Sequence, residues 1–212
     1  MVFLNREKSL LKQTWLKQNQ TGRFIRLVCF LLLGSHAAFN SHALAASTAV
    51  ELRDPMEHFF HQSFNNLEEE LEIAIEENKT GVLIMFVDKD CPWCLKMKST
   101  IMNRSDVQEY YREHFRLLTI DVAGDTMMTD FSGNEMPEKD FAFKQHRVRA
   151  TPVFMFFDTT GKKLVRYTGI TRNVDEFIWL ADFVVNGEYR KTNFTKYKKN
   201  RKKQEKVVPL QQ

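Results

Sequence analysis

The chain has 212 residues, of which 43% are hydrophobic and 27% are charged, so it can form one globular domain with short extensions. Eight Gly and five Pro are too few for a low-complexity chain, and three Cys are too few for a disulfide framework. Residues 46–186 carry 24 Asp or Glu and 16 Lys or Arg, whereas residues 187–212 carry nine Lys or Arg and two Glu. An acidic domain with a basic tail argues against nucleic-acid binding by the domain.

Residues 1–45 have the layout of a secretory signal peptide. A polar, basic stretch over 1–26 precedes an apolar run over 27–39, and the small residues Ala43 and Ala45, with one residue between them, suit cleavage. The apolar run is shorter than the roughly 20 residues that span a bilayer. An uncleaved anchor and a first buried helix are the alternatives. Cleavage after residue 45 would leave two of the three cysteines, in the oxidising periplasm.

The mature chain opens with a short leader over 46–54 and a helix expected over 55–78. Apolar side chains at three- and four-residue steps predict one buried face of this helix. That face consists of Phe59, Phe60, Phe64, Leu67, Leu71 and Ile75. The glutamates at 68–70 and 76–77 predict a solvated face.

Three short segments rich in apolar residues predict the strands of a core sheet, over 82–87, 116–122 and 153–158. The first run is apolar throughout, which is typical of a strand covered on both faces. An alternating segment over 163–167 predicts the hairpin partner of the third strand. Further elements are expected as a small hairpin near 129–136 and helices over 91–103, 106–114, 138–146 and 175–186.

The first core strand leads to Cys91-Pro92-Trp93-Cys94, which begins a helix. Proline suits the first helical position because its missing N–H costs nothing there. A helix N-terminus presents unpaired N–H groups and the positive end of the dipole, which stabilise a thiolate. Since Cys94 lies one turn further on, the two thiols can form a disulfide. We therefore expect Cys91 to attack and the more buried Cys94 to resolve the mixed disulfide.

Other chemistries also use two cysteines at this spacing. A c-type haem site needs His after the second Cys, where this chain has Leu95. A zinc site needs two more ligands, and His114 and His146 stand apart without a paired spacing. A purely structural disulfide would close a very small loop, with a modest entropic gain. Redox chemistry is favoured, with no metal and with no cofactor besides the Cys91–Cys94 disulfide.

The order of these elements resembles the thioredoxin superfamily over about residues 55–187. The resemblance rests on the strand before the Cys pair and on Arg149-Ala150-Thr151-Pro152 before the third core strand. It implies an α/β fold with a central mixed β-sheet flanked by helices, an extra N-terminal helix and an insertion after the second core strand. The chain is most similar to the secreted SoxW-like group, through residues 83–86, 130–133 and 148–158.

The resemblance also assigns roles outside the Cys pair. It implies that Pro152 is a cis proline facing the disulfide and that the Thr151 backbone pairs with a substrate chain. The alternative is a trans proline starting an edge strand. Trp93 is a candidate for contact with a partner, although an ordinary surface Trp would fit as well. Met85 and Asp90 depart from common thioredoxins, which have a buried acid and a Trp at these positions, so the direction of electron flow stays open.

The leading prediction is a periplasmic thiol–disulfide oxidoreductase that reduces disulfides in exported proteins. The resemblance suggests partners in sulfur oxidation or cytochrome maturation and a membrane thiol electron donor. The alternatives are a dithiol oxidase or isomerase and a non-enzymatic copper- or thiol-binding assembly factor. We expect a monomer. Residues 188–212 predict a basic, disordered tail that could weakly contact an anionic membrane or an acidic partner.

Overall fold

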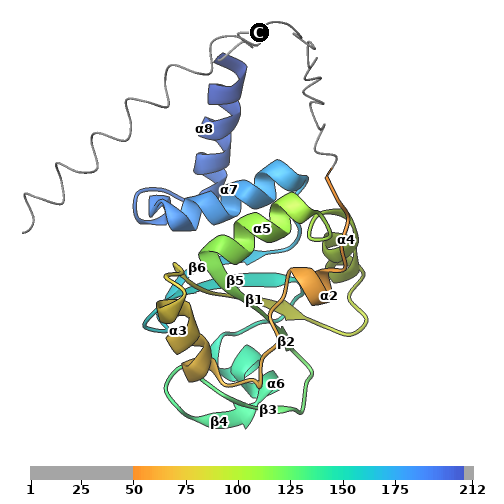
Figure 1. Cartoon of the computed structure of the whole chain (residues 1–212), viewed down its shortest axis with the longest axis vertical. Helices are drawn as coiled ribbons and strands as arrows, with labels where there is room; N and C mark the ends of the chain where they lie inside the picture. Colours follow the sequence, from red (N-terminus) through yellow and green to blue (C-terminus); the bar gives the residue numbers. More distant parts are fainter. Residues whose placement is uncertain (1–49, 208–212) are drawn as a thin grey trace, which may run out of the picture. The chain divides into compact units, whose positions relative to one another are not determined.

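The computed structural model describes residues 50–207, so the expected signal peptide lies outside the described residues. Its main sheet has four strands, β1 (Gly81–Val87), β2 (Phe115–Asp121), β5 (Val153–Asp158) and β6 (Lys163–Thr168). Their order across the sheet is β2, β1, β5, β6 (Figure 1). β1 pairs in parallel with β2 and antiparallel with β5, which pairs antiparallel with β6. The predicted α/β architecture with a central mixed sheet is confirmed.

Helices cover both faces of this sheet, with one group above it and one below it in Figure 1. The first group is α4 (Pro92–Thr100), α5 (Ser105–His114) and α7 (Val174–Val185). The second group is α3 (Leu67–Glu76), α6 (Glu138–Asp140) and the π-helical turn η2 (Phe141–Gln145). Along β1, Leu83 and Met85 join the core cluster of the first group, and Val82, Ile84 and Phe86 join that of the second. The alternation explains why the β1 sequence is apolar at every position.

The single helix expected over 55–78 is wrong, because the chain forms two helices here. α2 (Pro55–His58) is one turn long, and α3 begins only at Leu67. Between them, Asn65 adopts a left-handed conformation (φ 61°) and the Asn66 side chain caps α3 by accepting the Glu68 N–H at 3.1 Å. As a result, the side chain of Phe64 is 98% exposed instead of lying on a buried helix face.

The segment between α2 and α3 runs along the edge strand β2. The His61 N–H donates to the Leu117 carbonyl at 2.8 Å, and the Leu117 N–H donates to His61 Nδ1 at 3.0 Å. Beyond β2, the Asn65 carbonyl accepts the N–H of Thr129, a residue of the insertion that follows β2, at 2.8 Å. Covering a sheet edge in this way satisfies backbone groups that a continuous helix would leave unpaired.

The insertion after β2 contains the expected small hairpin, formed by β3 (Met127–Thr129) and β4 (Glu135–Pro137). Its turn is organised by Asp130, whose carboxylate accepts the Ser132 N–H at 2.8 Å and the Asn134 N–H at 2.9 Å. The helix expected over 138–146 is present as α6 followed by η2. η2 is a π-helix, a form that often occurs at functional sites.

The disordered tail expected from residue 188 is wrong for residues 188–207. These residues form a 3₁₀ turn, η3 (Glu188–Arg190), and a helix, α8 (Phe194–Val207). The rings of Phe194 and Tyr197 pack against Phe183 of α7, with centroid distances of 5.5 and 5.2 Å. The polar composition is that of an unstable isolated helix, but contacts with α7 supply the stability. No helix in residues 50–207 is both long and apolar enough to cross a membrane.

Candidate active site

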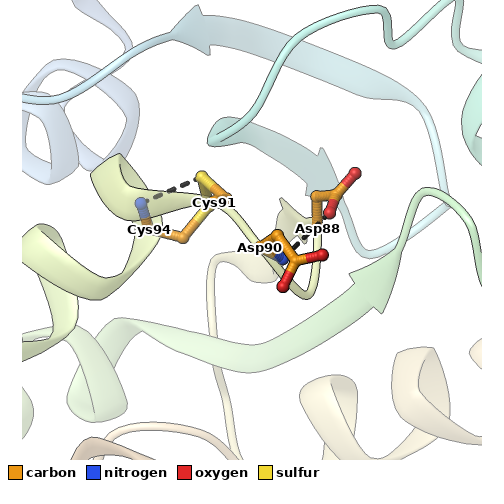
Figure 2. Close-up of a disulfide and its surroundings, with 4 residues drawn as sticks. All are labelled: Asp88, Asp90, Cys91 and Cys94. Atoms are coloured by element: carbon orange, nitrogen blue, oxygen red, sulfur yellow. Dashed lines mark hydrogen bonds between the residues drawn. A yellow bond between two sulfur atoms is a disulfide. The ribbon is translucent and has the colours of Figure 1, made fainter.

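The Cys pair lies where β1 ends and α4 begins. A tight loop joins the two elements, with the Asp90 N–H donating to Asp88 Oδ1 at 3.0 Å and the Cys91 N–H donating to the Asp88 carbonyl at 3.2 Å (Figure 2). Cys91 is the N-cap residue of α4, and Pro92 occupies its first turn. The sequence therefore places the first cysteine at a helix N-terminus, at the end of the sheet where β1 ends.

Cys91 and Cys94 form a disulfide, with their Cα atoms 5.3 Å apart. The Cys94 N–H donates to Cys91 Sγ at 3.0 Å, as Figure 2 shows. Cys91 is half-buried, whereas Cys94 is only 4% exposed. The N–H group that contacts Cys91 Sγ is one of the donors that a thiolate needs at this position. The geometry thus gives the two sulfur atoms different environments.

The surroundings of Cys94 are apolar. Met85 and Met97 are buried in the same core cluster as Cys94, so both methionines are core residues. Asp90, the acid next to the first cysteine, is exposed to solvent, which screens its charge. The buried acid of common thioredoxins is therefore replaced by a thioether side chain beside the Cys pair.

Thr151 and Pro152 lie at the same end of the sheet as Cys91. The bond between them is cis, as the resemblance implies. They precede β5, whose first residue, Val153, pairs with Phe86 near the end of β1. Pro152 is buried and Thr151 is half-buried, and the Pro152 carbonyl accepts the Gly169 N–H at 2.9 Å.

Trp93 extends the site onto the surface. Its side chain is 53% exposed, and Lys96 Nζ lies 5.5 Å from the centre of its ring. The structure thus brings the five predicted site residues to one end of the sheet: three lie at the start of α4, and Thr151 and Pro152 precede β5.

A hollow of about 450 Å³ beside Thr151 was not indicated by the sequence pattern. It is lined by residues from the ends of β1 and β2 and from η2, among them Asp88, Phe143 and Arg149. The Phe143 ring is 48% exposed, with the Arg149 guanidinium 5.7 Å from its centre. The sequence did contain one sign of an exposed ring here. Phe141 and Phe143 are two residues apart in a predicted helix, and residues at that spacing cannot both face the core.

The two histidines considered as zinc ligands pack against aromatic rings. His146 packs against the Phe141 ring at 4.5 Å, and burial together with Lys163 and Arg166 lowers its pKa to about 4. His114 contacts the Tyr110 ring at 4.8 Å. Among residues 50–207, no three His, Cys, Asp or Glu side chains are grouped so that they could hold a metal ion.

Comparison with known proteins agrees with this fold. A family model described as a thioredoxin-like domain matches residues 67–184, so the chain belongs to the family of thioredoxin-like domains. It is similar to the disulfide bond reductase DsbH of Chlamydia pneumoniae, with 27% identity over 100 residues. That match covers 46% of this chain and 57% of the relative, so it spans little more than half of the relative's length.

A solved structure of a thioredoxin-fold protein from Helicobacter pylori is also similar. Its TM-score is 0.55 at 20% sequence identity, over 72% of this chain and 96% of that one. This likeness concerns the fold. The placement within a SoxW-like group stays a prediction.

Proposed function

We propose that this protein is a thiol–disulfide oxidoreductase that reduces disulfides in exported proteins. The observation that carries the proposal is the difference between the two sulfur atoms. Cys91 is accessible at the start of α4 and accepts a helix N–H, whereas Cys94 is buried directly behind it. The sequence similarity to a disulfide bond reductase supports the reducing direction.

The reaction begins with the reduced protein. The Cys91 thiolate attacks one sulfur of the substrate disulfide, so that a mixed disulfide forms while the substrate S–S bond breaks and the departing thiolate takes up a proton. Cys94 then loses its proton and attacks Cys91 Sγ, which closes the Cys91–Cys94 disulfide and releases the second substrate thiol. The substrate has gained two electrons and two protons, which a membrane dithiol donor returns to the protein by the same exchange in reverse.

The backbone at Thr151, next to the Cys pair, is where we expect the substrate chain to bind. Thr151 is half-buried just before β5, and its neighbour Pro152 has no backbone N–H. An extended substrate segment lying along Thr151 would add a strand beside the Cys pair. Trp93, exposed on the α4 side, would contact the same segment.

Substitution of each cysteine tests the assigned order. Cys94→Ser should accumulate mixed disulfides with envelope proteins, visible on non-reducing gels and lost on reduction, because the resolving thiol is missing. Cys91→Ser should trap far less, and the double variant is the blank. Equal trapping by both single variants would contradict the roles. If the Cys91–Cys94 pair were mostly oxidised in cells, the protein would act as an oxidase instead.

We also propose that the mature protein is periplasmic. The succession of basic, apolar and small residues in 1–45 motivates this. Mass spectrometry of the protein recovered from the native envelope should show an N-terminus near Ala46. A full-length chain recovered from the cytosol would contradict both export and a role in reducing exported proteins.

A further inference from the structure

α8 is an unusually basic helix, with seven Lys or Arg and one Glu among the residues Phe194–Val207. Part of this charge holds the helix on α7. Lys198 and Lys202 contact the Glu176 carboxylate at 3.2 and 2.8 Å, and Arg201 contacts Asp182 at 3.2 Å. The side chain of Glu176 is only 2% exposed. The positive charges of α8 are therefore held on a fixed scaffold rather than spread over a mobile tail.

Three further lysines of α8 lie on the opposite face. Lys196, Lys199 and Lys203 follow each other at steps of three and four residues, so they share one side of the helix, and all three are exposed. Among the described ion pairs, none involves these lysines. The neighbouring residues Thr195 and Asn200 are polar and exposed as well.

The basic surface continues from α8 toward the Cys pair. A hollow of about 370 Å³ is lined by Arg172 and by α8 lysines that include Lys199 and Lys203. A second hollow, of about 590 Å³, is lined by the same Arg172 and by Lys96 of α4. Since Lys96 lies beside Trp93, cationic side chains lead from α8 to the active-site helix. We call Lys96, Arg172, Lys196, Lys199 and Lys203 the basic strip.

The loop that leads from β1 to the Cys pair carries one net negative charge, because Lys89 stands between its two aspartates. Asp88 and Asp90 precede Cys91, and Figure 2 shows both carboxylates on the loop that leads from β1. A partner that contacts Cys91 therefore meets the loop with Asp88 and Asp90 before it and α4 with Lys96 of the basic strip after it. Such an arrangement orients a charged partner and raises its rate of association.

We propose that the basic strip docks the acidic surface of a partner protein whose sulfur atoms react with Cys91. This proposal rests on the proposed function and adds the chemistry of the partner. The strip ends at the active-site helix, as a docking surface for a reacting protein must. An anionic membrane would match the charge of α8, but contact with a membrane does not require a path of cations to Trp93.

The test uses two synthetic peptides that share one disulfide loop, flanked by Glu residues in one peptide and by Gln in the other. The reduced protein should reduce the Glu peptide about 10-fold faster at low salt, the lower end of what electrostatic steering provides. The two rates should converge at high salt. Lys199→Gln/Lys203→Gln should lose most of this preference.

Lys162→Gln/Lys163→Gln is the matched control and should keep the preference. These two exposed lysines follow Asp158, which pairs with Gly81 at the start of β1, so they lie at the end of the sheet opposite to Cys91. Sedimentation with phosphatidylglycerol vesicles completes the comparison, with phosphatidylcholine vesicles as the reference.

Each result decides between distinct outcomes. Equal rates for the two peptides at low salt, or a preference that survives Lys199→Gln/Lys203→Gln, would overturn the docking surface but leave the proposed function standing. Vesicle binding that is lost in this variant while the peptide preference persists would assign the strip to a membrane. Failure of the unmodified protein to reduce either peptide would overturn the proposed function, and the docking proposal with it.

Discussion

His61 shows how a single polar side chain can complete a sheet edge. Its Nδ1 accepts the Leu117 N–H of β2 while its own N–H donates to the Leu117 carbonyl. Burial, the largest cause, and the positive charges of Arg116, Arg112 and Lys79 together lower the pKa of His61 to about 3. The imidazole is therefore neutral in the folded protein at neutral pH, as an acceptor must be.

This lowered pKa predicts a loss of stability in acid. Between pH 6.5 and about 3, His61 takes up a proton in the unfolded chain but not in the folded protein. The unfolded state binds more protons, so the free energy of unfolding falls as the pH is lowered through this window. The Asn amide oxygen can still accept the Leu117 N–H and does not titrate, so His61→Asn should lose less stability between pH 7 and pH 4.5. Urea unfolding at both pH values measures this.

His58→Asn serves as the control for that comparison. The His58 side chain is 49% exposed and lies one turn away in α2, so its replacement should leave the acid dependence as it is in the unmodified protein. If His61→Asn lost as much stability as the unmodified protein, burial of the neutral imidazole would not be the cause.

Among the elements, α3 is joined to β2 by a buried ion pair. Arg116 Nε donates to Glu70 Oε2 at 2.8 Å, and these side chains are 9% and 4% exposed. The glutamate run at 68–70 predicts a solvated face, and this is wrong at Glu70 because β2 places a cation beneath it. Glu68 and Glu69 are exposed as expected.

Breaking this pair should be costly, whereas replacing both partners should not. Glu70→Leu leaves the Arg116 charge buried and unpaired, so we expect a loss of about 3–5 kcal/mol in the free energy of unfolding. Glu70→Leu/Arg116→Met should regain most of that loss, because no buried charge remains. Glu69→Leu on the exposed face is the control, expected within about 0.5 kcal/mol of the unmodified protein. Equal losses for Glu70→Leu and the double variant would show that packing, not charge, is responsible.

In the molecule as a whole, α8 is part of the folded domain. Besides its aromatic contacts with Phe183, it places the Arg201 guanidinium 5.8 Å from the centre of the Trp179 ring. Burial alone would raise the pKa of Glu176, but hydrogen bonds from Lys202 and Lys198 outweigh it and leave the pKa below its ordinary value. The domain therefore extends past Gly187, where the expected domain ended.

Removal of α8 should destabilise the rest of the protein. A chain that ends at Gly187 uncovers Phe183 and loses the packing of two aromatic rings, which should lower the free energy of unfolding by about 2 kcal/mol. Denaturant unfolding of this chain and of a control that ends at Val207 measures the difference. Equal midpoints would mean that the helix adds nothing to the stability of the domain.

The sequence by itself determined the centre of the site. β1, the Cys91–Cys94 pair and the start of α4 depend on neighbouring residues: a run of apolar side chains, a proline in the first helical turn and a three-residue spacing. These features can be predicted because the residues that cause them lie within a few positions of each other. The cis bond before Pro152 is confirmed as well, but it was implied by the resemblance to the thioredoxin superfamily and not by the neighbouring residues alone.

Only the tertiary structure decided the rest, because the deciding partners are far away in the chain. Phe64 fits a helical face by its spacing, yet pairing of the neighbouring segment with β2 places it in solvent. Glu70 is buried because Arg116 lies 46 residues further on. α8, whose composition alone predicts disorder, is ordered because α7 presents a buried carboxylate and an aromatic surface to it. Periodicity and composition describe what one segment can do alone, whereas burial and charge pairing depend on which distant segment lies against it.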